Sequence, residues 1–307
     1  MRHDKAFKWI KRTSLGLLGI ALIVAALYVI NAYTLDQYEP EITRIEKHEE
    51  KSGDSGHIRV LAFNVHRCDA IKEGGIFGYT PQGDEVVGET VGKIAAFLRE
   101  QNADIVFMSE ICAESFLSHT NQIEALAEQA GYAWAVFGHN SSFGLPFARH
   151  RSGNAILSKY PISSAINFDV IEPHSPLQPK TNRRILKAIA EINGKQYSLY
   201  SVHLAAHYPA PRLRQAKKLH EVLSKDNNEI IMGGDFNDTP DSEPMRIIRS
   251  LPKIRTAENF EPTYVRWPPE HTIDYVFGPK SCQLVSYKRV INNLSDHYPV
   301  VAVFDSR

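Results

Sequence analysis

The feature that most constrains this chain is an uncharged apolar stretch near its N-terminus. No Asp, Glu, Lys or Arg lies between Arg12 and Asp36, and residues 14–35 read SLGLLGIALIVAALYVINAYTL. A helix rises about 1.5 Å per residue, so this stretch is long enough to cross the roughly 30 Å hydrocarbon core of a bilayer. The sequence therefore predicts one transmembrane helix over residues 14–35.

Two other interpretations of this stretch are a buried core helix and a cleaved signal peptide. A core helix of a soluble domain is disfavoured, because such a helix keeps a polar face and this stretch has none. A cleaved signal peptide remains open, although the stretch is longer than an ordinary signal core and no A-x-A cleavage site follows it.

The charges on either side of the stretch predict its orientation. Residues 1–13 carry five basic residues against one acidic residue, whereas residues 36–54 carry seven acidic residues against three basic ones. Basic flanks tend to stay in the cytoplasm, so we expect a single-pass protein with residues 1–13 cytoplasmic. The rest would then be extracytoplasmic, which in a Gram-negative cell is the periplasm. Residues 36–56 are polar, end in KSGDSG and predict a linker.

The remaining residues, 57–307, are enough for one large domain. Lys plus Arg equals Asp plus Glu at 35 each, which weighs against a protein that holds nucleic acid through bulk positive charge. The three cysteines have no CxxC spacing and are too few for a disulfide framework. Cys68 and Cys112 follow two candidate site residues closely, so a disulfide between them stays open for an oxidising compartment.

From residue 57 onward, short apolar runs rich in β-branched residues alternate with helical patterns. We expect strands at 58–65, 103–111, 133–138, 153–159, 185–192, 196–204, 229–236, 272–278 and 299–304. We expect helices at 86–101, 119–130, 210–225 and 243–250. Asn193-Gly194 between two of the strands predicts a tight hairpin. Hairpins mixed with helical crossovers predict an α/β sandwich of mixed sheets.

Polar residues recur at the ends of the expected strands. They are Asn64, Glu110, His203, Asp235, Asn237, Asp274, Asp296 and His297. Singly, such a residue is more often a turn former or a hydrogen-bonded structural histidine than a catalyst. Glu110 fits that interpretation poorly, because a carboxylate so close behind an apolar run needs a cation or a donor.

Taken together, these residues supply the parts of a metal-assisted hydrolase. Four carboxylates and an asparagine suit Mg²⁺, Mn²⁺ or Ca²⁺ better than Zn²⁺. A histidine exchanges a proton near neutral pH, and a neighbouring aspartate fixes its tautomer. A metal, carboxylates, histidine and asparagine can neutralise an oxyanion and activate water for attack on a phosphate ester.

The motifs FNV, SEI, GNAILSKYPI, SVHL, GGDFND, TIDYVF and SDHYPV occur in this order. In these motifs the chain, from about residue 57 to 306, resembles the endonuclease/exonuclease/phosphatase superfamily. The resemblance implies a four-layer α/β/β/α sandwich of two mixed sheets that hydrolyses phosphate-ester bonds. It also implies that Asn64, Glu110 and Asp296 hold the metal, with Mg²⁺ as the expected ion.

The resemblance further implies roles for five residues. Asp235 would orient or deprotonate the attacking water, and Asn237 would contact the phosphate. His297, paired with Asp274, would act on the phosphoryl group. His203 would bind the substrate and stabilise the transition state or assist the leaving group.

The substrate stays open. Arg184, in the pair Arg183-Arg184, is a candidate for phosphate contact, although an arginine pair before a strand is also typical of a solvated edge. Nucleic acid, a phospholipid headgroup and an inositol or sugar phosphate all fit the chemistry, and the anchor and zero net charge favour the last two. We expect no protein partner. The alternative is a catalytically silent binding module on the same fold.

Overall fold

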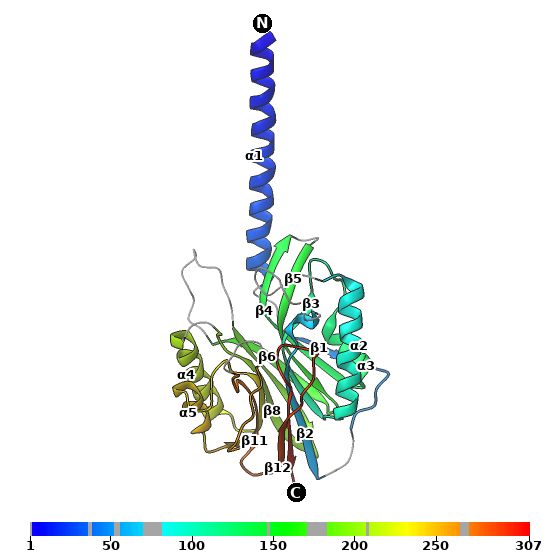
Figure 1. Cartoon of the computed structure of the whole chain (residues 1–307), viewed down its shortest axis with the longest axis vertical. Coiled ribbons are helices and arrows are strands. Elements are labelled where there is room, and N and C mark those ends of the chain that lie inside the picture. The colour runs from blue at the N-terminus through cyan, green and yellow to red at the C-terminus, as the bar shows by residue number, and fades with distance from the viewer. Residues whose placement is uncertain are drawn as a thin grey trace.

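The computed structural model of the chain describes residues 2–35, 39–51, 56–69, 82–145, 148–170, 183–206, 209–264 and 270–307. A long N-terminal helix, α1 (Arg2–Leu35), stands on one end of a layered domain (Figure 1). Within α1, Trp9–Ile30 is long and apolar enough to span a membrane, and none of it is buried in the protein. A signal sequence meets the same criterion, so the helix by itself does not distinguish a membrane span from a signal sequence.

The domain contains two sheets. The strands of the first are β1 (Glu41–Arg44), β2 (His57–Asn64), β3 (Ile105–Glu114), β4 (Trp134–Leu145), β5 (Ala148–Ser158), β12 (Gln283–Arg289) and β13 (Val300–Asp305), in the spatial order β1-β4-β5-β3-β2-β13-β12. The strands of the second are β6 (Ile162–Asp169), β7 (Arg184–Ile192), β8 (Lys195–His203), β9 (Glu229–Asp235), β10 (Ile254–Arg255) and β11 (Asp274–Pro279), in the order β10-β11-β9-β8-β7-β6. Each sheet mixes one parallel pair, β2 with β3 and β8 with β9, with antiparallel pairs. Both sheets are therefore mixed, as expected.

Helices cover the outer face of each sheet (Figure 1). α2 (Asp84–Gln101) and α3 (Gln122–Ala130) pack on the first sheet, and α4 (Pro209–Lys225) and α5 (Glu243–Arg249) pack on the second. A short turn, η1 (His66–Cys68), follows β2. The predicted four-layer α/β/β/α sandwich is confirmed.

The alternating directions of the side chains along β2 explain how this strand packs on both of its faces. Ile58, Val60 and Ala62 point into the core between the sheets, whereas Leu61 and Phe63 point into the core under α2 and α3. Successive side chains of a strand face opposite ways, so a strand covered on both faces is apolar at nearly every position. This is why β2 was recognisable as a continuous apolar run.

All the strands and helices expected from the sequence are present. Four described strands were not expected: β1, β6, β10 and β12. They are the outermost strands of the two sheets. Edge strands are short or carry exposed polar residues, so their periodic signal is weak. The predicted tight hairpin is confirmed at Asn193 and Gly194, whose φ angles of 52° and 75° both lie in the left-handed region.

The expectation that residues 36–56 form an unpacked linker is wrong for residues 41–51, which we call the strap. β1 pairs with β4, and the amide of Ile45 donates to the carbonyl of Ala133 at 2.9 Å. At the other end of the strap, Lys51 Nζ lies 2.9 Å from Asp104 Oδ1. Strand pairing uses the backbone, so a polar and charged composition did not prevent it. Residues 36–38 and 52–55 lie outside the described residues.

His150 on β5 makes stability depend on pH. Burial, assisted by the charge of Arg67, lowers the pKa of His150 to about 4, against about 6.5 for a histidine in an unfolded chain. Between these values the unfolded state binds more protons. The free energy of unfolding should therefore fall by about 3 kcal/mol as the pH drops from about 6.5 to about 4.

Urea unfolding of the detergent-solubilised protein, followed by tryptophan fluorescence, measures this dependence. His150→Gln should make the dependence shallower, because one of the titrating groups is gone. His119→Gln, the same substitution at an exposed position, supplies the control. An unchanged slope in His150→Gln would contradict the assignment.

Candidate active site

The candidate residues come together where the ends of both sheets meet. Asn64 ends β2, His203 ends β8, Asp235 ends β9 and Asp274 begins β11. Because β2 runs parallel to β3 in one sheet and β8 runs parallel to β9 in the other, these positions share one end of the sandwich. Asn64 Nδ2 donates to Asp235 Oδ2 at 3.1 Å and so joins the first sheet to the second.

The Asp235 carboxylate is the centre of the cluster. It is 1 % exposed, and its Oδ2 lies 3.5 Å from His203 Nε2 and 3.8 Å from His297 Nε2. Its Oδ1 accepts from the amide of Asn237 at 2.8 Å. Burial and the neighbouring Asp274 raise the pKa of Asp235, while His297 and Asn64 act in the opposite direction. A carboxylate with a raised pKa is a stronger base than an ordinary aspartate.

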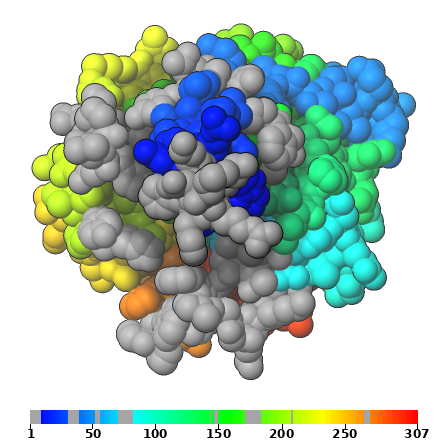
Figure 2. Space-filling model, turned by 90° about the horizontal axis from the view of Figure 1, so that it is seen from above, coloured from blue at the N-terminus to red at the C-terminus, as the bar shows by residue number. Residues whose placement is uncertain are grey.

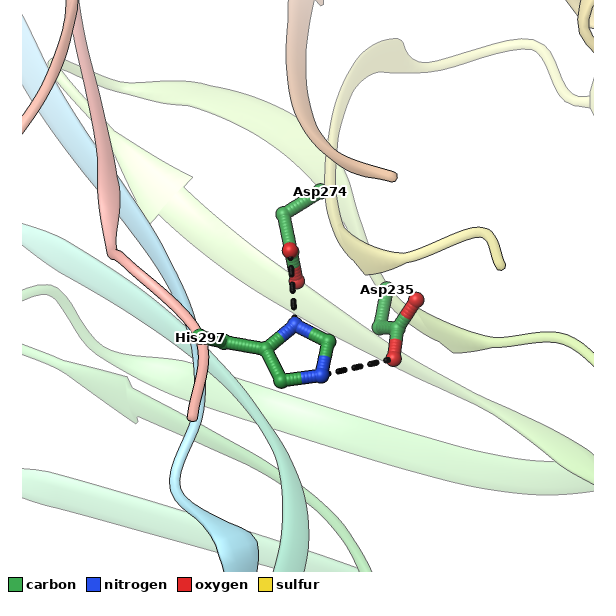
Figure 3. Close-up of side chains that lie close together, drawn as sticks. All are labelled: Asp235, Asp274 and His297. Atoms are coloured by element: carbon green, nitrogen blue, oxygen red, sulfur yellow. Dashed lines mark hydrogen bonds and ion pairs between the residues drawn. The ribbon is translucent and has the colours of Figure 1, made fainter. Parts of the chain in front are cut away.

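His297 bridges two aspartates (Figure 3). Its Nδ1 lies 2.8 Å from Asp274 Oδ2, and its Nε2 faces Asp235. Burial alone would lower the pKa of His297, but the two carboxylates raise it well above the ordinary value. The neighbouring carboxylates therefore favour the form of the ring in which both nitrogens are protonated. One ligand atom from each of these three residues lies within 4.8 Å of the others, so they are close enough to surround a metal ion.

Glu110 lies beside the cluster on a distorted part of β3. The pairing of β3 with β5 shifts between Met108 and Ile111, and Glu110 within this bulge has a φ of 53°. A non-glycine residue in this conformation is strained, and a bulge redirects a side chain from the plane of the sheet. Here it brings Glu110 Oε1 to 3.4 Å from Asn64 Nδ2 and 3.9 Å from His203 Nε2.

Arg67 is a site residue that the sequence did not reveal. It lies in the turn η1, and its guanidinium donates to Glu110 Oε2 at 2.8 Å. Burial favours the protonated form of Glu110, but the charges of Arg67 and Arg183 hold the pKa of Glu110 below its usual range. Glu110 is thus ionised at neutral pH. An arginine after a strand end is typical of an ordinary loop, so no sequence signal marked it.

His203 is held by Arg183. The guanidinium of Arg183 donates to His203 Nδ1 at 2.7 Å, which leaves the ring proton on Nε2, the nitrogen that faces Asp235 and Glu110. Burial and the charge of Arg183 lower the pKa of His203 well below the ordinary value. His203 is therefore a neutral donor, in contrast to the cationic His297.

Arg184, the expected substrate contact, points elsewhere. Its Nε donates to Asp169 Oδ1 at 2.9 Å and its Nη1 to the carbonyl of His139 at 3.3 Å. Side chains alternate across a strand, so Arg183 and Arg184 cannot both face the cluster. The structure brings Arg183 to the cluster and leaves Arg184 as a link between β7 and its neighbours.

Asp296 and Asn237 lie at the border of the cluster. Asp296 Oδ2 is 4.0 Å from His66 Nε2, and Ser295 beside it donates to the backbone oxygen of Asn64 at 2.7 Å. Asn237, with a φ of 53°, donates from its side chain to the carbonyl of Leu204 at 2.9 Å. Every candidate from the sequence except Arg184 therefore belongs to one contiguous group.

The cysteines of the chain are free and buried. The pKa of Cys68 is raised by burial and by its neighbour Cys112, so the two thiols are close, as their positions after Asn64 and Glu110 suggested.

Two stacked mixed sheets with buried carboxylates, histidines and an asparagine at one end define a phosphoesterase-type α/β sandwich. Comparison with known proteins agrees. Residues 61–297 match the Endonuclease/Exonuclease/phosphatase family, and the chain belongs to this family. Members of the family are hydrolases of phosphate esters, and this chain is such a hydrolase. The family generally uses divalent metal ions.

Individual relatives are distant. A protein of Escherichia coli K12 named uncharacterized protein YbhP is 24 % identical over 263 residues, which cover 80 % of this chain and 95 % of YbhP. An endonuclease/exonuclease/phosphatase from Beutenbergia cavernae superposes with a TM-score of 0.64 at 19 % identity, covering 81 % of this chain and 71 % of that one. The human Nocturnin catalytic domain, solved with a bound sulfate anion, gives 0.60 at 17 % identity, covering 86 % and 97 %.

Gly234 supports the site from the backbone. Its φ is 140°, and a Cβ there would lie 2.0 Å from the backbone oxygen of Val202. Gly234→Ala should therefore displace Asp235, lower the free energy of unfolding by about 3 kcal/mol and abolish turnover. Gly88, exposed on α2 with open space around it, supplies the control. Gly88→Ala should stabilise the protein by about 0.5 kcal/mol. Calorimetry measures the change in stability of both variants.

Proposed function

We propose that the chain hydrolyses a phosphate diester or monoester by attack of a water molecule that Asp235 orients and deprotonates. One observation carries the proposal: side-chain nitrogens of Asn64, His203 and His297 lie within 3.8 Å of Asp235 Oδ2. Such a group has a base with a raised pKa surrounded by donors for developing negative charge. This combination is what attack on a phosphoryl group requires.

The two histidines then take different roles. His297, kept cationic by Asp274, stabilises the charge that develops on the phosphoryl oxygens. His203, neutral with its proton on Nε2, donates a hydrogen bond to the phosphoryl group or to the leaving oxygen. Arg183 fixes this tautomer and lies beside the same space, and Asn237 contacts the phosphate from the end of β9.

The donor set around Glu110 fits a hard divalent cation. Glu110, Asn64 and Asp296 offer oxygen atoms, and the lowered pKa of Glu110 keeps this carboxylate ionised, as a ligand must be. We propose that these three residues hold the ion, with Mg²⁺ as the first candidate. Bound there, the ion supplies Lewis-acid stabilisation of the phosphoryl charge.

We further propose that α1 is a membrane anchor with a cytoplasmic N-terminus and an extracytoplasmic catalytic domain, residues 57–307 together with the strap. The basic residues before the apolar segment and the acidic residues after it support this orientation. In a Gram-negative cell the domain would lie in the periplasm. The convergence of the candidate residues favours a hydrolase over a silent binding module.

Substitution of Asp235 or His297 should abolish activity. Asp235→Asn keeps the size of the side chain but removes the base, and His297→Ala removes the cation. Each should lower kcat on bis(p-nitrophenyl) phosphate by at least about 10³-fold, and EDTA should do the same to the unmodified protein.

The exposed Asp241, six residues beyond Asp235, provides the matched control. Asp241→Asn should keep full activity. Undiminished turnover in Asp235→Asn, or in EDTA, would rule out the proposed reaction.

Substitutions of the adjacent Arg183 and Arg184 should have different effects, one on activity and the other on stability. Arg183→Met should lower kcat about 100-fold with little change in melting temperature, because it frees the tautomer of His203 and removes a positive charge near the phosphate. Arg183→Lys should recover part of kcat. Arg184→Met should instead lower the melting temperature, because it breaks the links to Asp169 and His139.

The nitrogen chemical shifts of labelled histidine report the tautomer directly. If Arg183→Met left both the shifts of His203 and kcat unchanged, Arg183 would have no positioning role.

A further inference from the structure

The strap determines which end of the domain meets the anchor. β1 is antiparallel to β4, β4 is antiparallel to β5, and β5 is antiparallel to β3. β3 therefore points the same way as β4 and opposite to β1. It follows that the chain enters β1 from the end of the sheet where β2 and β3 finish, which is the end that carries Asn64 and Glu110.

The point of entry is level with the site. Glu41, the first residue of β1, pairs with Phe137, which pairs in turn with Ala155 of β5. Ala155 pairs with Met108, and Met108 pairs with Phe63, the residue before Asn64. Strands are about 4.8 Å apart, and β1 is three strands away from β3. The entry point thus lies about 14 Å to the side of β3.

The connection between helix and strap is short. Only residues 36–40 separate Leu35, the end of α1, from Glu41. At no more than about 3.6 Å per residue, six steps reach about 20 Å. The strap itself is fixed by its pairing with β4, by an ion pair between Glu41 and Arg151, and by Lys51 on Asp104. The domain therefore cannot turn its opposite end toward the membrane.

The arrangement in space agrees with the connectivity. α1 rises from one end of the sandwich beside β4, and the C-terminus lies at the opposite end (Figure 1). Seen along the axis of α1, the helix projects from within the outline of this end face (Figure 2). The face that carries the site is thus the face from which the anchor leaves.

Exposed apolar side chains occur at this same end. Phe116 and Leu117 follow β3 and are 38 % and 56 % exposed. Ile291, which is 68 % exposed, follows the end of β12. This end of β12 pairs with the start of β13, which lies beside the end of β2. Exposed apolar side chains at the end of a domain that adjoins a membrane anchor are suited to rest against the headgroup region of a bilayer.

We infer that the active site faces the membrane in which α1 is anchored, and that its substrate is a phosphate ester carried on a lipid headgroup of that same membrane. The inference rests on the proposed function and adds the substrate class. The strap begins within about 20 Å of the anchor's end, and β3 lies about 14 Å to the side of it. An active site tethered this closely meets membrane-borne esters at high effective concentration. The site cannot reach esters on a separate membrane, because it lies on the end of the domain that faces the anchoring membrane.

Reconstitution into vesicles tests the inference. The full-length protein is placed in vesicles of phosphatidylethanolamine, phosphatidylglycerol, phosphatidic acid and sphingomyelin with Mg²⁺, and release of water-soluble phosphate is measured. Lipids with labelled phosphorus are supplied either in the same vesicles or in separate, protein-free vesicles. We expect release from the same vesicles to exceed release from separate vesicles at least about tenfold. Asp235→Asn protein gives the blank.

A longer tether should remove this preference. A flexible Gly-Ser segment of about 20 residues, inserted between Glu39 and Pro40, adds roughly 25 Å of mean reach. Release from the same vesicles should fall and release from separate vesicles should rise. The same segment added after Arg307, at the opposite end, should change neither. Turnover of soluble bis(p-nitrophenyl) phosphate should be equal in all three proteins.

The outcomes separate the two proposals. Cleavage of the soluble diester with equal release from both vesicle populations, or with release from neither, would overturn the membrane-facing inference and leave the proposed function intact. No cleavage of the diester or of any lipid would overturn the proposed function and the inference with it. A preference for the same vesicles that survives the longer tether would show that the short connection is not its cause.

Discussion

The hydrogen bond from Asn64 to Asp235 crosses from one sheet to the other, and the site depends on the packing that allows it. Each residue ends a central strand of its own sheet, so the bond forms only if the two sheets stack with their parallel pairs finishing at one end. The apolar core between the sheets provides that alignment. Stacked sheets leave little freedom to slide, because their side chains interdigitate.

Burial then decides the charge state of each group. Carboxylates in this environment remain ionised only where a cation is near. Glu110 has Arg67, whereas Asp235 and Asp274 share His297. One histidine becomes cationic between two carboxylates, and the other stays neutral beside an arginine. Two residues of the same type thereby acquire different chemistry from their neighbours alone.

The sequence predicted the central strands and most of the residues that converge in the candidate site, and it failed in identifiable places. The outermost strands β1, β6, β10 and β12 were not predicted, because they have little apolar periodicity. The sequence predicted a substrate contact for Arg184 and not for Arg183. It does not show which of two adjacent side chains points toward the site, because that depends on the face of the sheet that the site adjoins. Arg67 was missed because a loop arginine gains its role only from the carboxylate that the fold places beside it. Each failure concerns a relation between distant segments.

By itself, the sequence determined that an apolar helix precedes a domain of alternating strands and helices, and that polar residues stand at the ends of those strands. These are local properties, set by side-chain periodicity and by charge along the chain. Only the tertiary structure decided that the polar residues form one cluster, which protonation state each favours, and that the chain leaves the N-terminal helix at the end of the sheet that carries this cluster. Those depend on strand order and direction, because segments far apart in the chain become neighbours only through sheet pairing and packing.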